Sequence, residues 1–146
     1  MTSRTPKIRA GIIPYFFCKE TQKHKMLFMA PSDPKFGGPE MQCCKGKVEE
    51  GETILEAALR EGFEELGLFR GNIKSYKQIP LELGKTTFFV AEIEDPELFG
   101  IPHFETGATK WLFLNEFLEQ GRKLHKPVVK CAVDTILNGE IHEQKI

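Results

Sequence analysis

Three glutamates at helical spacing are the residues in this sequence that could do chemistry together. Glu61, Glu64 and Glu65 stand at positions i, i+3 and i+4, so on a helix their side chains project from nearly one side. Like-charge pairs at this spacing weaken a helix by about 0.2–0.5 kcal/mol each, and a positive group is expected beside them. A divalent cation such as Mg²⁺ would fit, because it prefers oxygen ligands and shares its coordination shell with phosphate. For the triplet alone, a solvated acidic helix face is the alternative interpretation.

The surrounding sequence predicts the helix that would carry these glutamates. Thr53 is a good N-cap residue, and Glu56 three positions later completes a capping-box pattern. Gly67 can adopt the left-handed conformation that ends a helix. Between them, residues at helical spacing form one apolar stripe, which comprises Leu55, Ala58, Leu59, Gly62, Phe63 and Leu66. We therefore predict one helix from Thr53 to Leu66, with Arg60 placed to pair with Glu56 or Glu64 on its polar face.

The rest of the chain predicts a mixed sheet with helices packed on it. Runs of β-branched and aromatic residues bounded by turn residues indicate strands, at 8–18, 26–30, 41–44, 73–79, 86–93 and 109–114. Loops are predicted at 31–39 and 45–52. Two further helices are expected, one at 116–120 capped by Asn115 and one at 127–137 that ends at Asn138-Gly139. The order of these elements predicts an α/β (α+β) sandwich in a single domain over 1–146.

Composition limits the partners of the protein. The chain has 146 residues and a formal net charge of −1, so it has no general positive field that would hold nucleic acid. Phosphate must be recognised by a few placed cations or a metal, and no DNA partner is expected. We see no signal-peptide pattern and no apolar stretch of membrane-spanning length. The four cysteines form no C-x-x-C pair and fit a reducing compartment. We expect a cytoplasmic protein without a membrane partner, as a monomer or homodimer.

The helix and the loop before it match a known signature. The segment 46–68 resembles the Nudix box, G-x5-E-x7-R-E-U-x-E-E-x-G-U, where U is a bulky apolar residue. Eight specified positions fall in register, namely Gly46, Glu52, Arg60, Glu61, Glu64, Glu65, Gly67 and Leu68. One position departs, because Gly62 stands where an apolar side chain is usual. It lies on the buried stripe, and we interpret it as closer packing of helix on sheet at a cost of about 1 kcal/mol in helix propensity.

Other segments resemble two branches of this family, the diadenosine tetraphosphate hydrolases and the RNA pyrophosphohydrolases. They are the segments 9–13, 41–46 and 85–93, together with a glutamate, Glu105, six residues before Trp111. Cys44 departs from the pattern, since proline is usual there. The resemblance implies a Nudix-type mixed β-sheet sandwiched between helices.

The resemblance also implies a role for each matching residue. Glu61, Glu64 and Glu65, with a backbone carbonyl near Lys45 or Gly46, would hold Mg²⁺, with Mn²⁺ as an alternative. Arg60 would orient Glu61 or Glu52, and Gly67 would shape the motif. Glu105 is either a further metal ligand or general base, or a plain surface glutamate. The general base therefore stays open among Glu61, Glu64 and Glu105.

Substrate contacts are expected from residues outside the helix. Arg9, Lys45 and Lys85 are candidates for binding the outer phosphates, although exposed cations also serve solubility. Tyr76, Phe36 or Phe88 could stack on a nucleobase, although strand aromatics are more often core residues. His103 and His125 are isolated in the sequence and receive no role.

The function expected from this resemblance is a Mg²⁺-dependent pyrophosphohydrolase. Its substrate would be a nucleoside diphosphate linked to another group, either a dinucleoside polyphosphate such as diadenosine tetraphosphate or a 5′-triphosphate RNA end. ADP-ribose or a nucleoside triphosphate is the alternative substrate. A nucleotide-binding sensor without catalysis is the alternative of another class, and the three intact glutamates argue against it.

Overall fold

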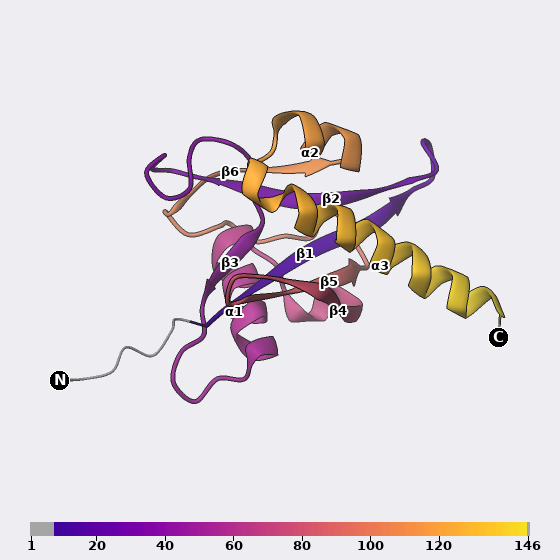
Figure 1. The fold of residues 1–146 in the computed structure, drawn as a ribbon, viewed down its shortest axis with the longest axis horizontal. Helices are drawn as coiled ribbons and strands as arrows, with labels where there is room; N and C mark the ends of the chain where they lie inside the picture. The colour runs from indigo at the N-terminus through magenta and orange to yellow at the C-terminus, as the bar shows by residue number, and fades with distance from the viewer. Residues whose placement is uncertain (1–7, 146) are drawn as a thin grey trace.

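One mixed sheet organises the chain. The computed structural model describes residues 8–145, with side chains described up to Asn138 (Figure 1). Six strands form the sheet: β1 (Arg9–Cys18), β2 (Lys23–Pro31), β3 (Cys44–Lys47), β4 (Ile73–Leu83), β5 (Thr86–Ile93) and β6 (Thr106–Leu112). Their order is β4-β5-β1-β2-β6, with β3 also paired to β1.

Strand β1 is the centre of this arrangement. It runs parallel to β5 along one side, from Arg9 to Tyr15. On its other side the first residues, Arg9–Ile12, pair with β3, and the last ones, Tyr15–Cys18, pair with β2. The sheet therefore divides at the middle of β1, which places β3 beside the start of β1 and next to the helix that follows in sequence.

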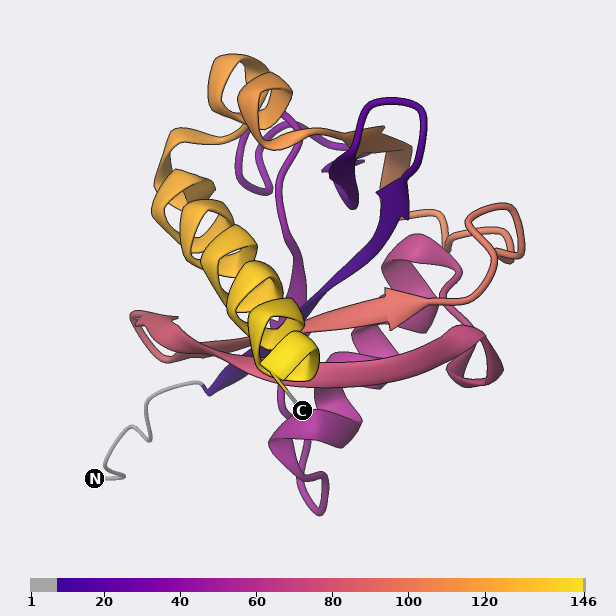
Figure 2. The same cartoon turned by 90° about the vertical axis from the view of Figure 1, so that its right-hand side faces the viewer.

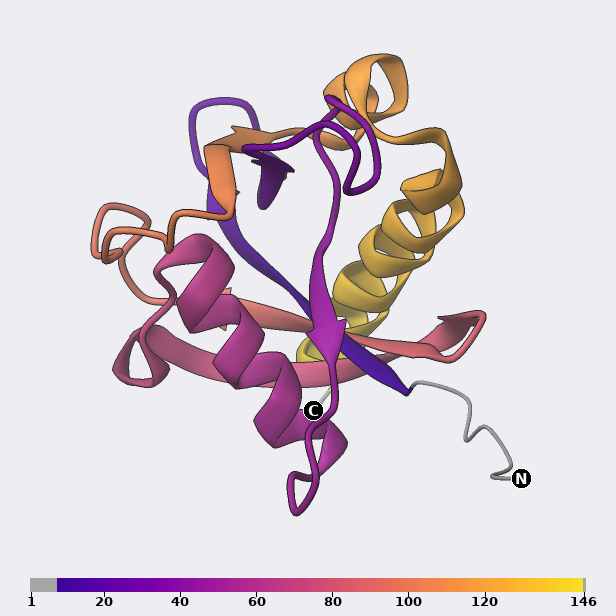
Figure 3. The ribbon, with the colours of Figure 1, turned by 90° about the vertical axis from the view of Figure 1, so that its left-hand side faces the viewer.

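The helices cover both faces of the sheet. Helix α1 (Ile54–Leu66) lies on one face, whereas α2 (Leu114–Gln120) and α3 (Lys126–Lys145) lie on the other, as Figures 2 and 3 show. Two short 3₁₀ turns, η1 (Arg70–Asn72) and η2 (Lys123–His125), complete the elements. No described helix is long and apolar enough to cross a membrane.

Each face of the sheet has its own hydrophobic core. Successive side chains of a strand point to opposite faces, so one strand contributes residues to both cores. In β2, Met26 and Phe28 join the core under α2 and α3, whereas Leu27 and Met29 join the core under α1. The predicted mixed sheet between helices is thus confirmed.

Helix α1 has the ends that its sequence predicts. The Thr53 hydroxyl accepts a hydrogen bond from the Glu56 N–H at 3.1 Å, and the Glu56 carboxylate accepts one from the Thr53 N–H at 2.8 Å. Gly67 ends the helix with φ of 74°, and its N–H donates to the carbonyls of Gly62 and Phe63. A side chain at Gly67 would also meet the backbone of Gly100, so both backbone conformation and space require glycine there.

Several predicted boundaries were wrong. Strand β4 continues to Leu83, past the end expected at 79, and β6 covers Thr106–Leu112 where 109–114 was expected. Three further differences concern β3, α2 and α3. The strand expected at 41–44 is displaced, because β3 covers Cys44–Lys47 and only isolated bridges form at Met41 and Gln42. Asn115 lies inside α2, which begins after Phe113, whose N–H donates to the Glu116 carboxylate at 2.8 Å. Helix α3 continues to Lys145, past the stop expected at 138–139, since asparagine and glycine disfavour a helix without ending it.

Gly62 lets α1 approach β1 closely. A β-carbon at this position would stand 2.9 Å from Cγ2 of Ile12 and 3.2 Å from Cδ2 of Leu68. This contact explains why glycine replaces the apolar residue that is usual in the motif, and it agrees with the closer packing inferred from the sequence.

Restoring a bulky residue at this position should therefore destabilise the protein. We expect Gly62→Leu to lower the free energy of unfolding by about 1–3 kcal/mol through overpacking, despite the better helix propensity of leucine. Chemical denaturation measures the change. The double variant with Ile12→Ala should lose less than the sum of the two single variants, and a more stable Gly62→Leu protein would contradict this account of the packing.

Candidate active site

Two glutamates of the motif, Glu61 and Glu65, are held against β3. Glu61 is 8% exposed, and the Glu65 carboxylate accepts a hydrogen bond from the Lys45 N–H at 3.3 Å. Gly46 leaves the space that Glu61 occupies, because a β-carbon there would meet the Glu61 carboxylate. Gly46, which begins the motif, and Glu61 on the helix are therefore in direct contact.

The buried carboxyls of Glu61 and Glu65 are costly to ionise together. Burial and, after it, the charge of Glu61 together raise the pKa of Glu65 to about 8, while the hydrogen bond from the Lys45 N–H opposes the shift. Burial also raises the pKa of Glu61, against the nearby Arg60 guanidinium. A cation bound beside this pair would favour its charged form.

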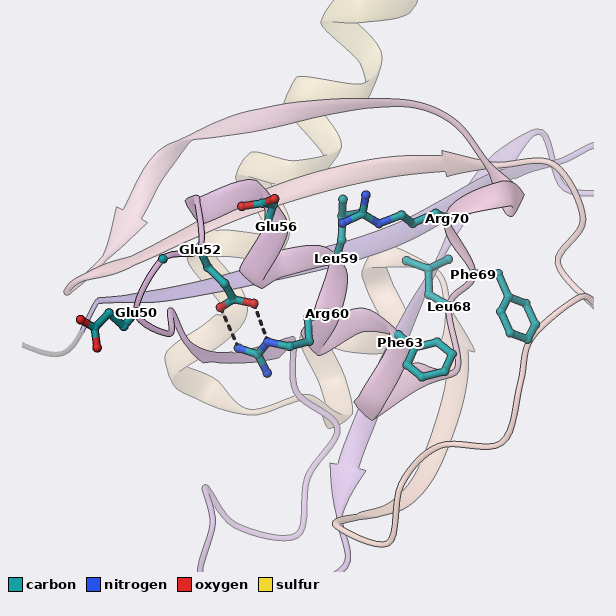
Figure 4. A pocket seen from close by; sticks show the side chains of 10 residues that line it. Glu50, Glu52, Glu56, Leu59, Arg60, Phe63, Leu68, Phe69 and Arg70 are labelled. Atoms are coloured by element: carbon teal, nitrogen blue, oxygen red, sulfur yellow. Dashed lines mark hydrogen bonds and ion pairs between the residues drawn. The ribbon is translucent and has the colours of Figure 1, made fainter.

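Arg60 ties the acidic residues of the site together. Its guanidinium binds the Glu52 carboxylate through Nε at 2.7 Å and Nη2 at 3.2 Å (Figure 4). Nη1 contacts Glu61 at 3.0 Å and Glu64 at 3.4 Å, and Nη2 donates to the Lys47 carbonyl at 2.8 Å. The hydrogen bond from Arg60 lowers the pKa of Glu52. Arg60 therefore fixes the loop before α1 to the helix and orients Glu61.

The donor atoms of this site suit a hard cation. Carboxylates and backbone carbonyls are oxygen ligands of the kind that Mg²⁺ takes. Among the described residues, no three acidic, histidine or cysteine side chains form a ready-made cluster for a metal. Arg60 contacts both Glu61 and Glu64. The repulsion between the neighbouring carboxylates of Glu61 and Glu65 nevertheless fits a divalent ion.

Glu105 faces the same site from another loop. Together with Glu65 and Lys45 it lines a cavity of about 170 Å³. Its loop is fixed to the end of α1, since the Thr106 hydroxyl donates to the Glu65 carbonyl at 2.9 Å and the His103 N–H to the Glu64 carbonyl at 2.8 Å. The structure thus brings Glu105 to Glu65, which lies forty residues earlier in the sequence.

A cavity of about 590 Å³ gathers the cations. Its lining includes Arg9, Lys45 and Lys85, the candidates for binding the outer phosphates, and also Arg122. Burial lowers the pKa of Lys45, and the neighbouring Arg122 and Arg9 lower it further. Lys45 lines this cavity and the one with Glu65 and Glu105, so it joins the cationic cavity to the acidic site.

Sequence reasoning missed Arg122. It follows α2, and its position comes from a long-range contact in which its N–H donates to the Met41 carbonyl at 2.7 Å. Beneath it, buried His125 accepts a hydrogen bond at Nδ1 from the Cys43 N–H at 3.0 Å. Burial lowers the pKa of His125 to about 3, with Arg122 and Lys45 adding to the shift. His125 is therefore a neutral residue supporting the cationic cavity, and local sequence carried no signal for either residue.

The aromatic candidates lie in three different settings. Tyr76 is half-exposed on β4 at the edge of the sheet, packed edge-on to Phe89 at 6.3 Å between ring centroids. It lines neither cavity described above. Phe88 is fully buried in the core. Phe36 lines the cavity that contains Glu65 and Glu105.

A third cavity lies on the outer side of α1. It measures about 540 Å³, and its lining includes Glu52, Arg60, Phe63 and Phe69 (Figure 4). None of Glu61, Glu64 and Glu65 lines it. The three candidate metal-binding glutamates therefore lie outside this cavity.

Comparison with known proteins defines the family. Residues 12–130 match the NUDIX domain. The Arabidopsis thaliana protein "Nudix hydrolase 16, mitochondrial" is 31% identical over 135 residues, which covers 80% of this chain and 73% of that protein. The chain therefore belongs to the Nudix hydrolase family, whose members act on phosphorus-containing acid anhydrides.

Solved structures share the fold at low identity. An Ap4A hydrolase binary complex from C. elegans has a TM-score of 0.71 at 19% identity and covers 91% of this chain and 98% of its own. The NUDIX domain of NrtR from Shewanella oneidensis, solved with ADP ribose, has a TM-score of 0.70 at 13% identity. The match covers 92% of this chain and 90% of that domain's chain. These likenesses confirm the Nudix fold.

The raised pKa of Glu65 predicts how stability depends on pH. In the metal-free folded protein Glu65 keeps a proton up to a pKa of about 8, whereas the unfolded chain loses it near 4.3. Its contribution to stability is complete below the unfolded pKa and is lost as pH rises through about 8. Mg²⁺ must displace that proton when it binds. The gain in Tm on adding MgCl₂ should therefore be larger near pH 9, about one unit above the Glu65 pKa, than near pH 6, about two units below it. Thermal melts measure both effects, and a pH-independent gain in Tm would contradict them.

Proposed function

We propose that the protein is a Mg²⁺-dependent pyrophosphohydrolase of dinucleoside polyphosphates, of which diadenosine tetraphosphate is the type. The observation that carries this proposal is the position of Lys45, which lines both the acidic cavity and the cationic one. A phosphate chain that is cleaved beside Glu65 can continue past Lys45 toward Arg9, Lys85 and Arg122. Four cations in one place suit a substrate with several phosphates beyond the cleaved bond.

The metal would be held by oxygen ligands of α1 and β3. We assign Glu61, Glu64, Glu65 and the Gly46 carbonyl to Mg²⁺, with Mn²⁺ as an alternative. When bound, the ion neutralises phosphate charge and lowers the pKa of a bound water. Arg60 keeps Glu61 in place through its contacts with Glu52 and the Lys47 carbonyl.

Glu105 is the carboxylate best placed to take a proton from the attacking water. Glu61 and Glu64 both contact Arg60, whereas Glu105 forms no ion pair with another described side chain and lines the cavity beside Glu65. A general base must reach its water while keeping its lone pairs available. We therefore assign the base to Glu105.

ADP-ribose is a weaker candidate for the same site. It carries two phosphates, and both would be occupied at the cleaved bond, leaving Arg9, Lys85 and Arg122 without a partner on the substrate. The likeness to the ADP-ribose-bound domain of NrtR concerns the fold of that protein. Substrate preference is therefore expected to depend on the cationic cavity.

Removing one positively charged side chain from the cationic cavity should affect the hydrolysis of these two substrates differently. We expect Arg122→Gln to lower kcat/KM for diadenosine tetraphosphate by about tenfold or more, since hydrogen bonds to charged groups contribute about 1.5–3 kcal/mol. Cleavage of ADP-ribose should change little. Steady-state assays with Mg²⁺ measure both, with exposed Lys130→Gln as the matched control for a lost charge. Wild-type protein that prefers ADP-ribose or 5′-triphosphate RNA would overturn the proposed substrate, and nucleotide binding without turnover would indicate a sensor.

A further inference from the structure

A fourth cavity lies far from the candidate active site. It measures about 510 Å³ and is bordered by the β1–β2 hairpin, the start of α2 and the middle of α3. Its lining includes Phe17, Lys23, Phe113, Val133 and Leu137, none of which lines the other three cavities. Phe17 stands eight residues along β1 from Arg9 of the cationic cavity, a separation of about 26 Å at the usual rise of a strand.

Apolar side chains form most of the walls of this cavity. Phe17 on β1 is 42% exposed and Leu137 on α3 is 43% exposed. The His24 ring packs edge-on to Phe17, with 5.2 Å between ring centroids. Leu114 and Val133 pack at the border of the core under α2 and α3. Ligand cavities usually measure about 300–1,000 Å³ and combine apolar or aromatic walls with a few polar groups, so the size and lining fit a small molecule.

The hairpin turn that borders the cavity is fixed. Gln22 has φ of 61°, a left-handed conformation that is uncommon for residues other than glycine. Its N–H donates to the Cys18 carbonyl at 2.8 Å, and its side-chain Nε2 donates to the Lys19 carbonyl at 2.8 Å. The turn therefore holds the next residue, Lys23, beside the cavity.

The charge around this cavity is positive. Among its described lining residues there is Lys23 and no aspartate or glutamate. Lys25 adds a second cation, since its Nζ lies 5.1 Å from the centre of the Phe113 ring. The nearby carboxylate of Glu116 already accepts a hydrogen bond from the Phe113 N–H at 2.8 Å. A ligand with an anionic group would therefore complement the charge of this cavity.

We propose that this cavity is a second ligand site, for a small aromatic anion with a flat apolar body of one or two rings and one acidic group. Two phenylalanines in the walls favour rings over an alkyl chain, because pairs of aromatic rings interact beyond the burial of their area. The acidic group lies beside Lys23. The site is separate from the Nudix reaction, because none of the candidate metal and phosphate ligands lines it.

The test uses two fluorescent probes that differ only in charge, 8-anilinonaphthalene-1-sulfonate and its neutral counterpart N-phenyl-1-naphthylamine. We expect the protein to bind both in excess chelator. Lys23→Gln should weaken binding of the sulfonate by about twofold to fivefold, the effect of one exposed charge pair, and leave the neutral probe unchanged. Leu137→Ser should weaken both probes by about fivefold or more, because it removes an apolar wall. Ile101→Ser, at a residue that is 92% exposed outside the cavity, is the matched control.

The same titrations contain the results that would overturn the site. They are a wild-type protein that binds neither probe, a loss of binding in Ile101→Ser but not in Leu137→Ser, or equal effects of Lys23→Gln on both probes. An excess of diadenosine tetraphosphate with MgCl₂ should not displace the sulfonate, and displacement would assign the probe to the nucleotide site. Exposed Lys23→Gln keeps the test available if Leu137→Ser does not fold.

Sedimentation velocity tests the other occupant of this cavity, a second copy of the chain. An oligomeric state that is the same in the wild-type protein and in Leu137→Ser agrees with the ligand site. A wild-type dimer that Leu137→Ser dissociates would overturn it, because the cavity would then be part of an interface between two copies.

Discussion

Replacing Glu65 by glutamine is expected to lower Mg²⁺-dependent hydrolysis by about a hundredfold to a thousandfold, the range seen when one stabilising group is lost from an active site. Glutamine keeps the size of the side chain and removes the negative charge that the metal requires. The same change should raise stability without metal, because Glu65 is ionised against burial and against Glu61. Activity assays and thermal melts near pH 9, about one unit above the Glu65 pKa, measure the two effects.

The opposite directions of these effects make the prediction specific. A residue that only supports the fold would lose activity and stability together. Glu97→Gln, which neutralises an exposed glutamate outside the site, is the matched control and should change neither. Retained activity in Glu65→Gln would remove Glu65 from the metal site, and a marked loss of stability would show that its charge has a structural partner.

Substituting alanine for Gly46 is the second change with a large expected effect. The added β-carbon would meet the Glu61 carboxylate, which must then leave its place between Arg60 and Glu65. We expect metal affinity to fall by about 10–100-fold, as when the support of a metal ligand is lost, with a corresponding loss of activity at low Mg²⁺. Isothermal titration with MnCl₂ measures the affinity.

A second glycine provides the matched control for this variant. Gly71 has no heavy atom within 4 Å of the place where its β-carbon would stand, so Gly71→Ala should bind metal like the wild-type protein. High Mg²⁺ should partly restore activity to Gly46→Ala, because the ligands remain in the chain. If Gly46→Ala binds Mn²⁺ as tightly as wild type, Glu61 is not held in the position described.

Local patterns in the sequence were sufficient for α1 and its ends. The capping pair, the apolar stripe and Gly67 lie within one segment, and each acts through residues a few positions apart. The glutamates and Gly46 likewise belong to one continuous motif, which explains why their proximity could be predicted. Even the departure at Gly62 had a local signal, a glycine on a buried stripe.

The rest of the site depends on contacts between distant segments. Arg122 reaches the cationic cavity because its N–H donates to the carbonyl of Met41, and Gln42 faces the smaller cavity because it is bridged to Met29. Neither residue belongs to a pattern of its own. Tyr76 shows the converse, since a plausible stacking residue on a strand lies at the sheet edge, outside both cavities.

The most direct test of the central claim is hydrolysis of diadenosine tetraphosphate by the purified protein, with products resolved by ion-exchange chromatography. We expect nucleotide products in Mg²⁺, none in excess chelator, and none from the Glu64→Gln/Glu65→Gln double variant, whose stability should remain at least that of the wild-type protein. Cleavage that persists in chelator or in the double variant would contradict the claim that the carboxylates of α1 and a divalent cation carry the reaction.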